Sequence, residues 1–283
     1  MKTLRRLIAY GAPLWWLTLG APPRLRPQEP AYEVWAVRFA TLPSFPVTGL
    51  VAGADRSRRM DIAMMVWLLS DGSGRRVLVD AGFHRRKFLD RWHPQDYRQP
   101  SEAIASAGVR PEDITDIIIT HVHWDHLDGV DLFPNARVWI QRAEYRYYVA
   151  ADGTPRNTAI DPDNAAELRA LQRSGRLRLV DGDAREIMPG ITVYTGGQHT
   201  RASQYVGVRT AAGTVVLASD NLYLYENLEL RAPIAQTLDP KANLAAQERM
   251  RSIASDLRLI VPGHDPAVFD RFMMVAPGVA SIR

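Results

Sequence analysis

The sequence contains no cysteine among its 283 residues. This absence excludes a disulfide-stapled scaffold, a thiolate-ligated zinc site, an iron–sulfur cluster and a thiol nucleophile. Any bound metal ion must therefore be held by His, Asp and Glu side chains. The sequence also lacks the dense Lys/Arg stripe of a nucleic-acid-binding protein, because 35 basic and 31 acidic residues leave a net charge of only +4.

Long apolar runs are scarce as well. One candidate lies at the amino terminus, where the basic Met1–Arg6 precedes an uncharged stretch, Leu7–Ala21, and a Pro-rich segment. The pattern predicts a signal peptide over residues 1–21 and a linker over 22–30, because the stretch is short for a membrane span. We therefore expect a periplasmic or secreted protein with no stable membrane span after processing. The alternative is a cytoplasmic protein whose apolar arm packs on the domain or on a partner.

Residues 31–283 alternate predicted strands and helices, and no linker divides them, so we expect one domain. The segment Thr41–Arg59 is rich in Pro, Gly and small residues, which predicts a loop. Ser101 is the expected cap of a short helix. Strands are expected at Ala31–Ala40, Ile62–Leu69, Arg76–Asp80, Asp116–Thr120, Ala136–Gln141, Leu177–Val180, Ile191–Tyr194, Tyr205–Arg209, Thr214–Ala218 and Leu257–Val261, and helices at Ser101–Ala107, Arg142–Ala150, Asp163–Ser174 and Asn243–Ser255.

The chemistry is concentrated in one short segment, which reads His121-Val122-His123-Trp124-Asp125-His126. The chain has seven histidines, so three of them in six residues is a specific signal. Alternate residues of an extended chain point to one side, so His121 and His123 can share a ligand. The segment directly follows a predicted buried strand, and the carboxyl ends of such strands are where α/β proteins place their sites.

Three further candidates, His199, Asp220 and His264, each follow another predicted apolar strand. Their common position indicates that several strand ends converge on one place. Together with the histidine-rich segment they supply five His and two Asp, enough for two metal ions if one carboxylate bridges. Such nitrogen and oxygen ligands suit zinc, and also iron, manganese or cobalt. The remaining His84 and His93 lack ligand spacing, and we expect them to be exposed, like the basic residues at 56–59 and 85–87.

With these residues in view, the sequence from about residue 31 onwards resembles the metallo-β-lactamase superfamily. The segment 77–82 also resembles the strand and turn that lie under the site in that family. The resemblance implies an α+β fold, a four-layer αβ/βα sandwich with the metals at one edge of two packed sheets. It implies two ligand sets that share a bridging carboxylate and a hydroxide: His121, His123 and His199 for one ion, Asp125, His126 and His264 for the other, and Asp220 between them.

Within this superfamily the chain most resembles the N-acyl-homoserine lactonases. Asp220 stands where the β-lactamases often have Cys or Ser, and the diiron oxygen-reducing members have Glu in place of His123. The chain has no room for the inserted domain of the nuclease members. Only 19 residues follow His264, where glyoxalase II-type thioesterases add a glutathione-binding domain. Tyr223 matches the lactonase pattern, with packing as its alternative role because Tyr225 is nearby.

This resemblance implies hydrolysis of a lactone by hydroxide held at two divalent metal ions, zinc first among the options. Tyr223 would stabilise the carbonyl oxygen, and Asp125 would carry a proton from the nucleophile to the leaving group. Four residues are candidates to line an apolar pocket for an acyl chain: Phe45, Leu50, Met64 and Met65. For the two methionines, the alternative is ordinary core packing.

We expect the partner to be a small-molecule lactone or ester, with no nucleic acid and, as one option, a homodimer. Two other functions stay open at this point. The first is an exported metal-dependent hydrolase of another ester, thioester or phosphodiester. The second is a non-catalytic metal-dependent binding protein on the same fold.

Overall fold

A computed structural model describes residues 31–283. The expected signal peptide, residues 1–21, and the linker, 22–30, lie outside the described residues. Within residues 31–283, no helix is both long enough and apolar enough to cross a membrane. The strands are β1 (Glu33–Pro46), β2 (Arg59–Ser70), β3 (Arg76–Val79), β4 (Asp116–Ile118), β5 (Arg137–Gln141), β6 (Leu177–Val180), β7 (Arg185–Met188), β8 (Ile191–Thr195), β9 (Gln204–Thr210), β10 (Gly213–Ser219), β11 (Ile260–Pro262), β12 (Met273–Ala276) and β13 (Val279–Ser281). The helices are α1 (Arg86–Trp92), α2 (Pro100–Ala103), α3 (Trp124–Leu127), α4 (Arg142–Tyr148), α5 (Pro162–Arg173), α6 (Tyr225–Leu230), α7 (Pro240–Ile253) and α8 (Val268–Arg271).

These strands form two sheets. The first has eight strands in the order β12-β13-β1-β2-β3-β4-β5-β6, and the second has five in the order β11-β10-β9-β8-β7. Strands β3 to β6 run parallel to one another, and β10 runs parallel to β11. Parallel neighbours present their carboxyl ends at the same sheet edge, which brings the loops after them together.

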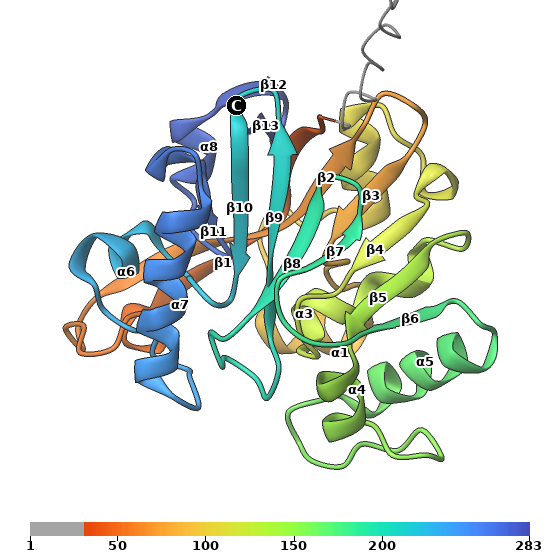
Figure 1. Ribbon diagram of the computed structural model, residues 1–283. Helices are drawn as coiled ribbons and strands as arrows, with labels where there is room; N and C mark the ends of the chain where they lie inside the picture. The colour runs from red at the N-terminus through yellow and green to blue at the C-terminus, as the bar shows by residue number, and fades with distance from the viewer. Residues whose placement is uncertain (1–30) are drawn as a thin grey trace, which may run out of the picture.

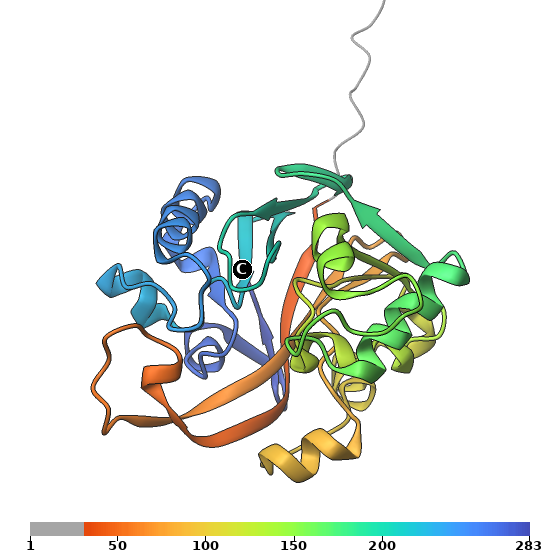
Figure 2. The ribbon, with the colours of Figure 1, turned by 90° about the horizontal axis from the view of Figure 1, so that it is seen from below.

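The two sheets pack face to face, and helices cover the outer face of each, as Figure 1 and Figure 2 show. The side chains of β2 show why both faces of the first sheet are covered, because they alternate between the two faces and are apolar on each. Met64 and its alternate neighbours pack toward the helices, whereas Met65 and Trp67 pack into the layer between the sheets. A third cluster joins the second sheet to α7 through Val216 and Met250. The result is the expected αβ/βα four-layer sandwich.

Three expectations about local structure were wrong. The strand expected from Leu257 begins only at Ile260, because Leu257–Leu259 forms a 3-10 turn capped by the Asp256 side chain. Thr41–Pro46 is not a loop but continues β1, which pairs with β2 through register shifts between Arg38 and Ala40 and between Leu42 and Phe45. The second irregularity contains a proline and the left-handed Ser44, features that a bulge tolerates. Ser101 is not a helix cap, because α2 begins one residue earlier with Pro100 at its first position.

Candidate metal centre

The structure brings all seven predicted metal-ligating residues to one place, at the carboxyl ends of four strands. The segment from His121 to His126 follows β4, and its second half begins α3, for which His123 is the N-cap. His199 follows β8, Asp220 follows β10, and His264 follows β11. The first strand belongs to one sheet and the other three to the second sheet, so the site lies where the two sheets meet.

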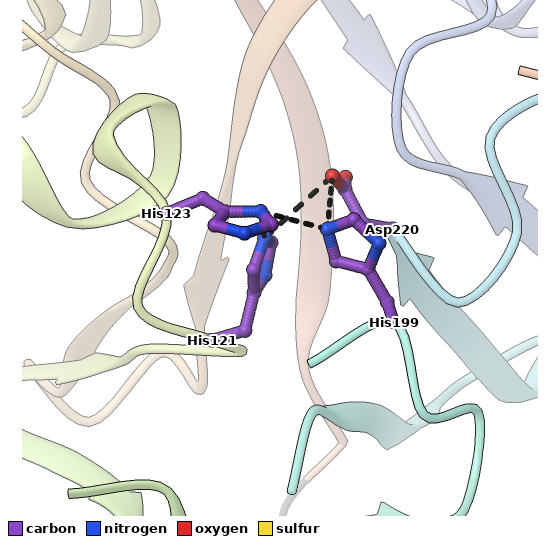
Figure 3. Close-up of side chains that lie close together, drawn as sticks. All are labelled: His121, His123, His199 and Asp220. Atoms are coloured by element: carbon purple, nitrogen blue, oxygen red, sulfur yellow. Dashed lines mark hydrogen bonds and ion pairs between the residues drawn. The ribbon is translucent and has the colours of Figure 1, made fainter. Parts of the chain in front are cut away.

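One group of side chains is formed by His121, His123, His199 and Asp220, whose ligand atoms all lie within 4.8 Å of one another. His123 Nδ1 lies 3.0 Å from His121 Nε2 and 2.8 Å from His199 Nε2. Asp220 Oδ2 lies 3.6 Å from His121 Nε2 and 3.3 Å from His199 Nε2. Figure 3 shows the four side chains pointing at one another, with His121 and His123 on one loop and His199 and Asp220 on two others.

A second group, Asp125, His126 and His264, also has its ligand atoms within 4.8 Å. Asp125 Oδ2 lies 3.5 Å from His126 Nε2 and 3.8 Å from His264 Nε2. The other oxygen of Asp220, Oδ1, lies 3.2 Å from His126 Nε2 and 3.0 Å from His264 Nε2. Asp220 therefore turns one carboxylate oxygen to each group, as a bridging ligand would.

The geometry of this cluster fits a pair of metal ions. Two nitrogen or oxygen ligands of one tetrahedral zinc ion lie roughly 3.3 Å apart, which is close to the separations seen here. His126 Nε2 and Asp220 Oδ1 are buried and make no hydrogen bond, although they lie 3.2 Å apart. Buried polar atoms are otherwise satisfied in folded proteins, so these two atoms indicate a missing partner such as a cation.

Four of the histidines turn Nε2 to the cluster and hold their other ring nitrogen, Nδ1, in a hydrogen bond. Such second contacts fix the ring orientation and the tautomer of a metal ligand. The four Nδ1 atoms pair with Thr120 Oγ1 for His121 (3.0 Å), Asp80 Oδ2 for His126 (2.8 Å), the Gln236 carbonyl for His199 (2.7 Å) and the Ala63 carbonyl for His264 (3.1 Å).

Asp80 connects several of the residues that surround the cluster through hydrogen bonds. It directly follows β3 with a left-handed φ of 61°, a conformation that costs a non-glycine residue about 1 kcal/mol. Its buried carboxylate accepts hydrogen bonds from Thr120 and Ser219 in addition to the His126 contact. Ser219 also has a positive φ, 48°, directly before Asp220. The backbone at both strand ends is therefore strained where it orients the site.

A glycine makes room for the bridging carboxylate. Gly263 directly precedes His264, and a Cβ atom at that position would lie 3.0 Å from Asp220 Oδ1. The same atom would lie 2.8 Å from the carbonyl oxygen of Ser219. Any larger residue would therefore separate β11 from β10 and move His264 away from Asp220.

The electrostatics of the cluster suit cation binding. Burial, followed by the neighbouring imidazoles, lowers the pKa of His121 well below its usual range, and burial lowers the pKa of His123 to about 3. Both rings are therefore neutral at pH 7 and have free lone pairs. Burial opposes ionisation of Asp220, but His126 and His264 outweigh it and hold the pKa of this carboxyl well below its usual range.

A small cavity of about 110 Å³ opens beside the cluster. Tyr223 lines it, and its hydroxyl lies 3.3 Å from His199 Nδ1. Burial raises the pKa of Tyr223 well above its usual range, so the hydroxyl keeps its proton. The cavity has a polar wall and an apolar wall. The polar wall contains His123, Asp125, Asp220, Tyr223, Gln236 and His264, and the apolar wall contains Leu42, Phe45, Leu50, Ile62, Trp92 and Trp124.

Phe45 and Leu50 thus line the cavity as expected, but Met64 and Met65 do not. The two methionines are 1% and 4% exposed and belong to two different core clusters, on opposite faces of β2. The period of a strand makes this outcome unavoidable, because neighbouring residues point to opposite faces. Their role is core packing.

The expectation of an exposed surface around the other two histidines was partly wrong. His93 is exposed, but the His84 side chain is 23% exposed and its Nε2 lies 2.9 Å from Asp131 Oδ1. Arg85 pairs with the fully buried carboxylate of Asp128, so it is not a surface residue either. The basic sequence alone could not predict these ion pairs, because the partners Asp128 and Asp131 come from a distant part of the chain.

Sequence reasoning missed several residues that support the cluster. Asp80 was visible only as part of a matched segment, and the Gln236 and Ala63 contacts use backbone oxygens that carry no sequence signal. Glu144 was also missed, although it is fully buried and its pKa is raised to about 7 by burial. A carboxylate in an otherwise ordinary amphipathic helix gives no hint of such a position.

Comparison with known proteins places the fold in a family. The model of the metallo-beta-lactamase superfamily matches residues 63–264. The chain belongs to this superfamily. The match begins in β2 and ends at His264, so it includes every residue of the cluster.

Several relatives share parts of the sequence. An N-acyl homoserine lactonase of Bacillus thuringiensis is 29% identical over 161 residues, which are 56% of this chain and 58% of that protein. Metallo-beta-lactamase domain-containing protein 1 of Mus musculus is 32% identical over 164 residues, 58% of this chain and 53% of that protein. The chain thus spans little more than half the length of the curated relatives it matches.

Solved structures extend the likeness of the fold. A quorum-quenching N-acyl homoserine lactone lactonase superposes with a TM-score of 0.70 at 20% identity, covering 88% of this chain and 98% of that one. A dizinc quorum-quenching lactonase superposes with a TM-score of 0.63 at 15% identity, covering 90% of this chain and 95% of that one. At these identities the superpositions establish a shared fold.

Proposed function

We propose that the protein is a metal-dependent hydrolase that opens the lactone ring of N-acyl-homoserine lactones or related lactones. The observation that carries the proposal is Asp220, whose two oxygens face two separate groups of ligand atoms beside a cavity lined by Tyr223. The lactonase relatives support the choice of substrate. Export to the periplasm or the medium is a separate proposal, which rests on residues 1–21 alone.

Two divalent ions held by the seven residues, with zinc favoured by the ligand set, would supply a water of low pKa and a Lewis acid for the carbonyl. Ligation requires neutral imidazoles and ionised carboxylates. Burial lowers the pKa of His121, His123 and His199, which are therefore neutral at pH 7. Burial also opposes protonation of His126 and His264, but Asp220 outweighs it and raises their pKa, so these two rings would release a proton when an ion binds. Their separation into two groups around Asp220 provides for one ion in each group. Zinc therefore stands as our proposal for the metal, with iron, manganese or cobalt as alternatives.

Tyr223 is placed to act on the substrate carbonyl. Because His199 turns Nε2 to the cluster, its ring proton lies on Nδ1, which donates to the Gln236 carbonyl and lies 3.3 Å from the Tyr223 hydroxyl. The tyrosine oxygen can therefore accept from His199 and leave its own proton free to donate into the cavity. A donor aimed at the oxygen that gains negative charge stabilises the transition state of ester hydrolysis.

Asp125 is placed to move a proton. Its side chain is 14% exposed and lines the cavity, and Oδ2 lies next to His126 and His264. A carboxylate at this position can take a proton from the attacking water and pass it to the leaving alkoxide. We propose this role in addition to ligation.

The apolar wall supports a substrate with a hydrocarbon part. Leu42, Phe45, Leu50 and Ile62 contribute apolar surface to the lining of the cavity. Trp124 lines both this cavity and a larger one of about 450 Å³, whose other lining includes Phe88 and residues 155–162. We propose that a long acyl chain extends past Trp124 into this larger cavity.

The alternative is a hydrolase of another ester, thioester or phosphodiester, because the cluster itself can serve any of these bonds. A substrate panel on the metal-replete full chain separates the two, with ring opening followed by proton release. We expect short- and long-chain N-acyl-homoserine lactones to be opened much faster than an aryl ester or a chromogenic β-lactam. Fast ester turnover with slow lactone opening would instead support the broader hydrolase. Two bound metal ions without any hydrolysis would support a binding protein.

A further inference from the structure

Glu144 is a buried carboxylate that lies between two loops of the metal centre without facing the cluster. It is the third residue of α4 and has no solvent exposure. Its side chain reaches the loop after β4, which carries His121 and His123, and the loop after β8, which carries His199. These loops come from different sheets, and one backbone hydrogen bond, from Gln204 to the Thr120 carbonyl at 2.9 Å, joins the chain beside them.

Three donors from the two loops converge on this carboxylate. Oε1 accepts from the backbone nitrogen of Val122 at 3.3 Å and from the Thr200 hydroxyl at 2.5 Å. Oε2 accepts from the backbone nitrogen of Ala202 at 2.7 Å. Val122 lies between two of the ligand histidines, and Thr200 directly follows the third. The carboxylate is thus tied to both sides of the 2.8 Å contact between His123 and His199.

The same helix makes a second link to the same loop. The Tyr148 hydroxyl, one turn further along α4, accepts a hydrogen bond from the backbone nitrogen of Arg201 at 3.2 Å. Residues 200–202 are therefore held at successive positions by one helix. This repeated contact shows that the loop after His199 is fixed by α4 and not by the cluster alone.

The stability of the core does not explain a carboxylate at this position. No basic side chain of residues 31–283 forms an ion pair with Glu144. An isolated buried carboxylate is costly, and an apolar side chain of similar size would be favoured for packing alone. What an apolar side chain lacks is the ability to accept three hydrogen bonds from two loops at once.

We infer that Glu144 is a positioning residue that sets the separation of the His121–His123 loop and the His199 loop, and thereby the metal affinity of the group formed with Asp220. The inference rests on the proposed metal centre and adds to it a residue outside the ligand set. Loss of such an outer contact typically lowers metal affinity 10- to 100-fold.

The test is a titration of metal-free protein with Co²⁺ alone at pH 8, where Glu144 is ionised. Visible absorption follows the binding and reports the coordination geometry independently of activity. Glu144→Gln keeps the size of the side chain but turns an NH₂ group toward one of the three donors. We expect one of two Co²⁺ equivalents to bind 10- to 100-fold more weakly, with an altered spectrum, and the other to change less than about threefold.

Asp116→Asn is the matched control, because Asp116 is also a fully buried carboxylate and begins the strand that leads to His121. It accepts hydrogen bonds from Arg137 and Trp139 at the opposite end of β4. We expect this variant to lower the melting temperature but to keep both Co²⁺ affinities and the spectrum of the wild type.

A milder pair of variants covers the case in which Glu144→Gln does not fold. Thr200→Val removes one donor while the carboxylate stays, and we expect a weakening of Co²⁺ binding by about three- to tenfold, with Thr200→Ser restoring the wild-type value. Wild-type affinity and spectrum in Glu144→Gln, or in Thr200→Val where that variant replaces it, would overturn the inference and leave the metal centre standing. A wild-type protein that binds no Co²⁺ would overturn both.

Discussion

Replacing Tyr223 by Phe removes one hydroxyl from the wall of the reaction cavity and leaves the ring in place. The hydroxyl lies 3.3 Å from His199 Nδ1, a long contact whose loss should cost less than about 1 kcal/mol of folding stability. Removal of a donor that stabilises a developing oxyanion costs far more in rate, about 3–4 kcal/mol at a well-built site. We therefore expect kcat for lactone opening to fall between about 10- and 1000-fold, with KM changed little.

The assay is steady-state proton release by the metal-replete protein, with metal content measured on the same sample. Tyr225→Phe is the control, because Tyr225 is buried like Tyr223 but its hydroxyl makes no hydrogen bond. We expect this variant to keep both the wild-type rate and the wild-type metal content. A Tyr223→Phe enzyme with an unchanged kcat would remove the hydroxyl from the mechanism. A parallel loss of metal and activity would show instead that Tyr223 acts through His199.

Three other changes follow from the same geometry. Asp220→Ala should lose bound metal and activity together, since both groups lose a ligand; two retained ions per chain, measured by elemental analysis, would contradict the bridging role. We expect the wild type to prefer decanoyl to butanoyl lactones, and Phe45→Ala to lower this preference about tenfold, the effect of about 1.4 kcal/mol of lost apolar contact. Met65→Leu should keep the wild-type preference, because Met65 lies in the core. Equal chain-length profiles for all three proteins would exclude the apolar wall. Burial raises the pKa of Glu144 from 4.5 to about 7. Between these two values the folded metal-free protein keeps a proton that the unfolded chain releases, so the free energy of unfolding falls as pH rises. Urea unfolding should show that the wild type loses about 2 kcal/mol of this free energy relative to Glu144→Gln between pH 5 and pH 8, and a difference that does not change with pH would contradict the raised pKa.

Much of the site could be predicted from sequence because its ligands follow the ends of apolar strands. The run Asp116–Thr120 is β-branched and buried, so the chain direction of β4 and the position of His121 after it were both readable. His199, Asp220 and His264 were found by the same argument, since each follows a short apolar strand. The superfamily resemblance supplied what strand ends alone do not contain, namely the division of the seven residues into two groups.

What could not be predicted depends on contacts between distant parts of the chain. Thr41–Pro46 has the composition of a loop, and it becomes a strand because β2 pairs with it on one side and the bulge before Phe45 accommodates the proline. The edge strand β12 and its neighbour β13 are too short to show a period. Glu144 has no local signal, because its three donors come from two loops that only the packing of the two sheets brings together.

The central claim is that activity depends on two metal ions bridged by Asp220. The most direct measurement adds Zn²⁺ to the metal-free full chain in small increments and follows both bound zinc and the opening of an N-acyl-homoserine lactone. We expect the rate to rise with bound zinc and to reach its maximum at two ions per chain. A metal-free protein that opens the lactone at the full rate, or a rate that is complete at one ion, would contradict this claim.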